Sequence, residues 1–127
     1  MRSFLISLGC LLVLAGSWLV YTNYSDEKIH EFNDRIETVI IEEVKSDRWQ
    51  QAEEHLDKLE DDWHQYKKVA CLFFSTNELN DIDYSFAKSK YYIKAEDLSN
   101  SSGELSYLKE QMRFLHANQE ITIANLF

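Results

Sequence analysis

Proline is absent from this 127-residue sequence, and glycine occurs only three times. Gly9 and Gly16 lie in an apolar N-terminal segment, so the rest of the chain contains almost nothing that interrupts a helix. Strands and tight hairpins are not expected, because the turn residues that they need are missing. Gly103 alone cannot form a glycine-rich phosphate loop, which excludes the usual nucleotide-binding enzymes.

Cysteine is equally scarce. Cys10 lies in the apolar segment and Cys71 lies far along a predicted helix, so the sequence predicts no disulfide between them. We interpret Cys71 as a small packing residue, although it could also cross-link two copies in an oxidising compartment.

Basic residues are outnumbered, with 13 Lys and Arg against 22 Asp and Glu and a formal net charge of −9. Such a surface repels nucleic acid and anionic lipid headgroups, so a nucleic-acid partner is not expected. Opposite charges occur at helical spacing, as in Glu54 and Lys58, which is typical of a solvated helix face.

The N-terminal segment, residues 4–21, carries no charge and is long enough to span a hydrocarbon core of about 30 Å. Arg2 precedes it and Asp26 and Glu27 follow it, which favours a cytoplasmic N-terminus and a C-terminal domain outside. Aromatic residues would lie at the outer interface: Trp18, Tyr21 and Tyr24. We therefore expect a single-pass anchor, residues 1–24, that contacts membrane lipid, and an extracytoplasmic domain, residues 25–127.

Two alternatives concern the processing of this segment. Residues 4–14 could be the apolar region of a cleaved signal peptide, with Ala15-Gly16-Ser17 as a cleavage site. A lipoprotein signal ending at Cys10 is the other, but Ser7 stands where leucine is usual and the preceding apolar run is short. Length and flanking residues favour the uncleaved anchor.

From Ser25 onward the pattern predicts four helices. The first is expected to begin at Ser25 as a cap, and its apolar face comprises Ile29, Phe32, Ile36, Val39, Ile40 and Val44. Ser46-Asp47 is expected to cap a second helix, whose apolar residues recur at alternating steps of three and four: Trp49, Ala52, Leu56, Leu59, Trp63, Tyr66, Ala70 and Phe73. This stripe fits a bundle helix or an intermolecular coiled coil, and the short breaks on both sides favour the bundle.

After a break at residues 75–77, the third helix carries two apolar stripes: Leu79, Ile82, Phe86 and Ile93, and Tyr84, Ala87, Tyr91 and Leu98. Residues 100–103 are expected to form a loop, with Ser101 and Glu104 as the capping box of a fourth helix. That helix also has two stripes: Leu105, Leu108, Met112 and Leu115, and Tyr107, Phe114 and Ile121. Residues 121–127 alternate briefly between apolar and polar and are expected to be helix or a packed tail. The predicted fold is all-α, an N-terminal transmembrane helix followed by an antiparallel bundle of about four helices.

Metal-binding bundles use Glu-x-x-His pairs on two helices, together with further acidic ligands. The candidates here are Glu27 with His30 and, with a shorter acid, Asp61 with His64. Because both histidines adjoin core positions rather than occupy them, we expect neither a metal nor another cofactor. Residue spacing reveals no Ser, His and acid arrangement, so an enzyme is not expected.

The plan of the chain resembles a bacterial family of unknown function, domain-of-unknown-function family 4363, seen mainly in Gram-positive spore formers. The resemblance covers nearly the whole chain and rests on the short anchor and on several residues: Trp49, Leu56, Leu59, Trp63, Glu78, Ile82 and the terminal Asn125-Leu126-Phe127. A histidine often stands near the start of the third helix in that family, where this chain has Asn77. The resemblance implies a plasma-membrane location and association with a multi-spanning membrane protein encoded nearby.

Two functional hypotheses follow. The first is a non-catalytic interaction or structural module outside the membrane, which contacts a membrane protein or a second copy through the leftover aromatic stripes: Tyr84, Tyr91, Tyr107 and Phe114. The alternative is an extracytoplasmic ligand-binding, metal-binding or sensor domain that uses Glu27, His30, Asp61 and His64.

Overall fold

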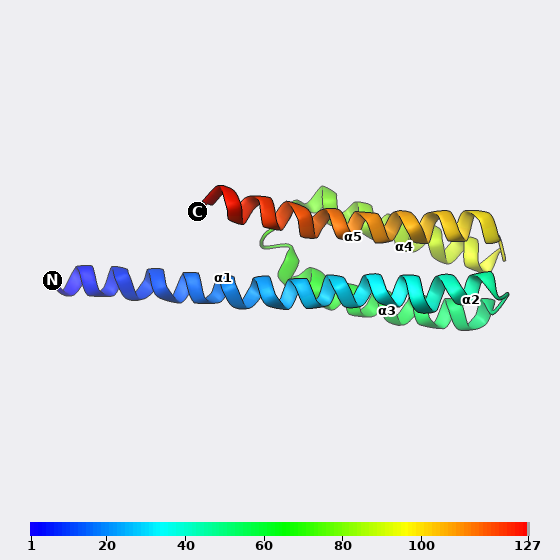
Figure 1. The fold of residues 1–127 in the computed structure, drawn as a ribbon, viewed down its shortest axis with the longest axis horizontal. Helices are drawn as coiled ribbons and strands as arrows, with labels where there is room; N and C mark the ends of the chain where they lie inside the picture. The colour runs from blue at the N-terminus through cyan, green and yellow to red at the C-terminus, as the bar shows by residue number, and fades with distance from the viewer. Residues whose placement is uncertain (127) are drawn as a thin grey trace.

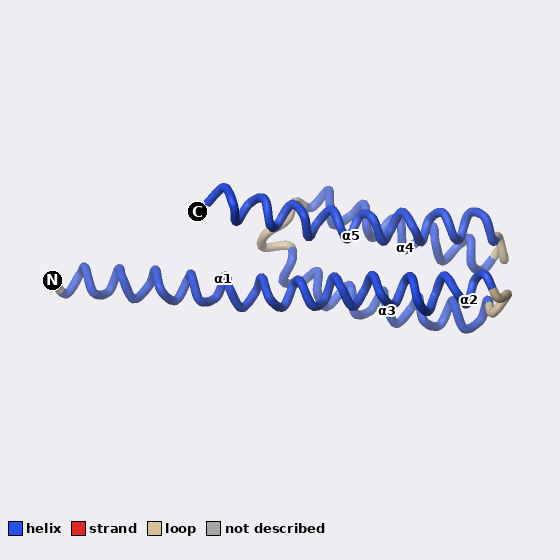
Figure 2. Tube along the Cα trace, in the orientation of Figure 1, coloured by secondary structure: helices blue, strands red, loops and turns tan. Residues whose placement is uncertain are grey.

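A chain without proline stays helical between its few turns, as Figure 2 shows. The computed structural model describes residues 1–126, with side chains described through residue 118. Its elements are α1 (Arg2–Arg35), the π-helical turn η1 (Ile36–Ile40), α2 (Ile41–Lys45), α3 (Trp49–Ala70), α4 (Thr76–Lys94) and α5 (Leu98–Leu126). α1, η1 and α2 form one uninterrupted helix of 44 residues. The described residues contain no strand, and the predicted all-helical bundle is confirmed.

The long N-terminal helix and α3, α4 and α5 run antiparallel to one another in sequence order (Figure 1). The turns at residues 46–48 and 95–97 lie together at one end, which we name the distal end. The turn at residues 71–75 lies at the other end, which we name the proximal end, and the first part of α1 extends beyond it.

One apolar face of each helix fills the core, as the periodicity predicts. The buried residues of α3 are Ala52, Leu56, Leu59, Trp63, Tyr66 and Ala70. Phe73 was predicted to continue this stripe, but it follows the end of the helix and remains 40% exposed. Since the stripe is buried within one chain, it forms a bundle core rather than an intermolecular seam.

The first stripes of the other helices are also buried, with Val39 only partly so. The core contains Ile29, Phe32, Ile36, Ile40 and Val44 from the N-terminal helix, Leu79, Ile82, Phe86 and Ile93 from α4, and Leu105, Leu108, Met112 and Leu115 from α5. The backbone of α5 is helical through Leu126, whereas the side chains of residues 119–126, including the predicted stripe residue Ile121, lie outside the described side chains.

Several predicted helix boundaries are wrong. Ser25 does not begin a helix, because α1 continues through it and its side chain is buried. The cap predicted at Ser46-Asp47 is also wrong, since Arg48 precedes α3 without a side-chain cap. Residues 100–103 are helical rather than a loop, because α5 already begins at Leu98.

The real capping box lies at the start of α4. The Ser75 hydroxyl accepts a hydrogen bond from the Glu78 backbone N–H at 3.3 Å, and the Glu78 carboxylate accepts one from the Ser75 backbone N–H at 3.1 Å. α5 uses Asp97 instead, whose carboxylate accepts the Asn100 backbone N–H at 3.0 Å. Both satisfy backbone donors that the first helical turn leaves unpaired.

Candidate interaction surfaces

Large aromatic side chains project from α4 and α5 into solvent. Their exposed fractions are 62% for Tyr84, 70% for Tyr91, 56% for Tyr107 and 60% for Phe114. They are exposed because each helix turns its other apolar stripe toward the core. These are the residues predicted to contact a partner, and the structure leaves all of them accessible.

A groove of about 610 Å³ runs between α4 and α5 on this outer surface. Tyr107 and Phe114 of α5 line it, together with acidic side chains of α4 such as Glu78 and Asp81. Tyr84 and Tyr91 are not among its lining residues. The groove therefore combines two aromatic rings with negative charge, an arrangement suited to binding a partner with apolar and basic side chains.

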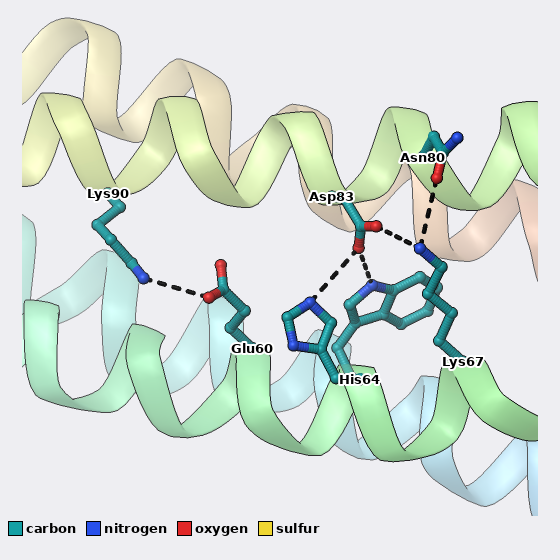
Figure 3. Close-up of polar contacts among 7 residues, drawn as sticks. Glu60, His64, Lys67, Asn80, Asp83 and Lys90 are labelled. Atoms are coloured by element: carbon teal, nitrogen blue, oxygen red, sulfur yellow. Dashed lines mark hydrogen bonds and ion pairs between the residues drawn. The ribbon is translucent and has the colours of Figure 1, made fainter.

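A polar seam joins α3 to α4 around Asp83 (Figure 3). The Asp83 carboxylate accepts a hydrogen bond from the Trp63 indole at 2.7 Å and another from the Lys67 ammonium group. The His64 ring lies 3.8 Å from the same carboxylate. This arrangement satisfies the only polar group of a tryptophan whose ring belongs to the core.

Lys90 forms a second polar contact between the same two helices. Its ammonium group lies 2.9 Å from Asp57. It also donates a hydrogen bond to Glu60 at 3.2 Å, which Figure 3 shows. The hydrogen bond to Asp57 raises the pKa of Lys90 most, burial opposes this rise, and Glu60 reinforces it. Both contacts join α3 to α4 through charge-assisted hydrogen bonds, so we interpret their role as structural.

The residues considered for a metal site do not come together. His30 of α1 lines a groove shared with α5, and its ring lies 3.5 Å from Asp34. His64 of α3 faces α4 beside Asp83, while Glu27 and Asp61 are exposed. Among the described residues, no group of three or more His, Cys, Asp or Glu side chains could hold a metal ion.

The α1–α5 groove is instead lined by polar contacts between the long N-terminal helix and α5. His116 of α5 lies 2.9 Å from Asp26, and Lys109 lies 3.2 Å from Glu37. These contacts hold the C-terminal helix against the long N-terminal helix. Sequence spacing could not reveal them, because the partners are separated by most of the chain.

At the proximal end, Tyr66 lies in the core with its hydroxyl 2.5 Å from that of Ser25. Burial raises the pKa of Tyr66, and the hydrogen bond with Ser25 opposes this rise only in part. Tyr66 therefore stays neutral and joins the middle of α1 to the end of α3. Ser25 was predicted to cap a helix, and its contact with Tyr66 was not predicted.

A second aromatic cluster lies beside the turn at residues 71–75. The Phe73 ring stacks on Tyr21 with 4.0 Å between ring centroids, and it meets Trp18 edge-on at 5.1 Å. Trp18 and Tyr21 were expected at a membrane interface, whereas Phe73 was assigned to the core. The structure thus joins the end of the apolar N-terminal segment to the α3–α4 turn.

Fold and surfaces define an antiparallel four-helix bundle with one helix, α1, long and apolar enough to cross a membrane. Its most apolar 18-residue window has a mean hydropathy of 2.1 and no residue buried in the bundle. A family model, Domain of unknown function (DUF4363), matches residues 19–126, and the chain belongs to this family. The match leaves out residues 1–18, so it does not address most of the apolar segment. No curated protein and no solved structure matches the chain.

Proposed function

We propose that this protein is a single-pass plasma-membrane protein whose bundle stands outside the membrane as a non-catalytic interaction module. The observation that carries the proposal is the continuity of α1. Residues 2–17 of this helix are exposed, and its continuation supplies Ile29, Phe32 and Ile36 to the core. Because no loop separates the two parts, the anchor would hold the bundle at a defined height and angle.

The outer surface of α4 and α5 is the proposed contact face. Exposed tyrosine and phenylalanine side chains supply apolar contact area, and aromatic residues are enriched among the residues that dominate binding energy. The groove beside Tyr107 and Phe114 gives such a contact a concave centre. We propose a protein in the same membrane as the partner, because the anchor confines the bundle to that surface.

The polar clusters support a non-catalytic role. Asp83 and Lys90 connect α3 to α4, and His116 and Lys109 connect α5 to the long N-terminal helix. In each case the polar side chains are paired across a helix interface. The alternative, a metal-binding sensor, would need Glu27 and His30 of α1 to meet Asp61 and His64 of α3, and no group of three or more such side chains comes together among the described residues.

The first experiment is photo-cross-linking in cells, with a photoreactive phenylalanine analogue placed at Tyr107, at Phe114 or, as a matched control, at exposed Lys58 on α3. We expect one adduct of defined mass from positions 107 and 114 and none from position 58. Mass spectrometry of the adduct distinguishes a membrane protein from a second copy. Equal adducts at all three positions, or none at any, would contradict the proposed face.

Membrane orientation needs a separate test. A Ser46→Cys variant, with Cys10 and Cys71 changed to serine, carries its only thiol at the distal end, in the turn at residues 46–48. We expect a membrane-impermeant maleimide to label this thiol in intact cells. Labelling only after lysis would place the bundle on the cytoplasmic side and overturn the proposed orientation.

A further inference from the structure

The α3–α4 turn differs from the rest of the molecular surface in its chemistry. Residues 69–77 contain no charged residue, although 28% of the chain is charged. Three apolar side chains of this region are exposed: Val69 by 37%, Leu72 by 75% and Phe73 by 40%. A turn on a soluble bundle is normally polar, so this exposed apolar group requires a physical reason.

The turn lies where the apolar part of α1 meets the bundle (Figure 1). Phe73 touches both Tyr21 and Trp18, the first residues of α1 that the bundle covers. Beside them, an apolar hollow of about 480 Å³ is lined by Gly16, Ser17, Val20, Tyr21 and Tyr24 of α1 and by Val69 of α3. The exposed turn is therefore continuous with the surface of the apolar segment.

The length of the exposed part of α1 also indicates that the proximal end of the bundle lies close to the membrane. Its uncharged exposed residues run from Phe4 to Val20, with Trp18 alone partly covered, and would cover about 26 Å at a rise of 1.5 Å per residue. A bilayer has a hydrocarbon core of about 30 Å. A span that is too short must thin the bilayer or draw flanking structure toward it. Here the flanking structure is the proximal end of the bundle.

We propose that the apolar surface formed by Val69 at the end of α3 and by Leu72 and Phe73 in the following turn inserts into the interfacial region of the same bilayer that holds α1. This second contact would fix the tilt of the bundle, because two separate points of attachment restrict rotation about the anchor. The occupant of the apolar surface is membrane lipid, whose acyl chains and glycerol region match exposed aliphatic and aromatic side chains. The inference rests on the anchoring proposed above and adds a lipid-binding surface to it.

Local charge favours this contact despite the acidic character of the chain. Lys68 is exposed in the last turn of α3, close to Leu72. On the α1 side, residues 18–25 are also uncharged. The acidic side chains that would repel anionic headgroups begin only at Asp26 on α1 and at Glu78 on α4.

The test uses the full-length chain in vesicles of phosphatidylcholine and phosphatidylglycerol, with an environment-sensitive fluorophore on a single cysteine. Cys71 is a native reporter in the turn, made unique by Cys10→Ser. Ser17→Cys reports on the anchor and Ser46→Cys on the distal turn, each with Cys10 and Cys71 changed to serine. Lipids that carry a spin label near the headgroup quench only fluorophores at the interface.

We expect blue-shifted emission and strong quenching at positions 17 and 71, with neither effect at position 46. Quenching at 17 but not at 71 would overturn the inference and leave the anchor intact. The absence of quenching at 17 would overturn the anchor, and the inference with it. If a partner protein covered the turn instead, position 71 would stay unquenched in these protein-free vesicles.

A second variant tests the apolar side chains themselves. Leu72→Asp should lower the quenching at Cys71 several-fold, because a carboxylate is costly to place in the interface. Its matched control is Asn77→Asp, which adds the same charge at an exposed position of α4. Since Leu72 is 75% exposed, the substitution should leave the helical circular-dichroism spectrum unchanged. Equal quenching in the two variants would contradict the insertion of Leu72.

Discussion

At both ends of the bundle the chain reverses its direction between antiparallel helices, but the residues that form the turns differ. At the distal end, the turns at residues 46–48 and 95–97 are rich in charge, with Asp47, Arg48, Glu96 and Asp97. At the proximal end, the turn at residues 71–75 is Cys-Leu-Phe-Phe-Ser. All three reverse the chain between antiparallel helices. Chain reversal alone therefore does not explain the difference in composition, whereas the surroundings of each end do: water at one, the proposed membrane interface at the other.

Backbone conformation separates the two ends as well. Asp47 and Glu96 have φ values of 58° and 53° and follow the last residues of their helices. After each, a backbone N–H reaches back across the helix end, from Arg48 to Glu43 at 2.9 Å and from Asp97 to Tyr92 at 3.0 Å. This left-handed helix ending normally uses glycine. A chain with one glycine outside the apolar segment accepts strain at acidic residues instead.

The largest expected effect tests the proximal core. Tyr66→Ala should destabilise the protein by about 3–5 kcal/mol, because it opens a cavity among Phe32, Trp63 and Ser25. Urea unfolding of the full-length protein in detergent micelles, followed by circular dichroism, measures the change. Tyr84→Ala is the matched control on the exposed face and should alter stability by less than about 0.5 kcal/mol. A similar loss in both variants would mean that the two tyrosines do not differ in burial.

A smaller effect of opposite sign is expected at the distal end. Glu96→Gly should stabilise the protein by about 1 kcal/mol, because glycine adopts the left-handed conformation without the clash that a Cβ atom causes. Asp47→Gly should gain less, since aspartate tolerates positive φ better than glutamate. The midpoint of urea unfolding is the measurement. A lower midpoint for Glu96→Gly would show that its side chain contributes more than its backbone strain costs.

The sequence predicted the helical architecture well because the core stripes are long and regular. The α3 stripe from Ala52 to Ala70 is buried at every predicted position, since alternating steps of three and four leave one helical face apolar. The exposure of Tyr84 and Tyr107 also agrees with the existence of a second stripe on each helix. Such patterns depend only on the rotation of one helix, so a single sequence contains them.

Local boundary signals were far less informative. The pattern Ser-x-x-Glu occurs at Ser75 and again at Ser101, yet only the first begins a helix. Ser101 is buried inside α5, because the chain had already turned at Glu96. Capping signals compete with tertiary packing, and packing decides which of two equal signals is used.

Contacts between helices were beyond the reach of the sequence. Asp83 and Trp63 lie 20 positions apart, and their hydrogen bond depends on the relative rotation of α3 and α4. The Ser25–Tyr66 contact spans 41 positions. A buried tryptophan signals that its indole needs a partner, but not which residue supplies one. The candidate contact face, in contrast, could be predicted from the sequence. Its side chains are exposed, so their prediction does not depend on how one helix is rotated relative to another.

The smallest expected effect is a dependence of stability on pH that arises at the distal end, in the cap formed by Asp97. Hydrogen bonds from Asn100, first from its backbone N–H, hold the pKa of Asp97 below its ordinary value of 3.8. Because the folded pKa is the lower one, the ionised cap stabilises the fold above about pH 4, and this contribution is lost as the pH falls through the folded pKa.

Asp97→Asn keeps a capping oxygen that does not titrate. The stability difference between the wild-type protein and this variant should therefore shrink between about pH 6 and about pH 2.5, as measured by urea unfolding at both values. A constant difference would mean that Asp97 contributes through its shape alone, and the distal end would then owe its charge to solvation rather than to helix capping.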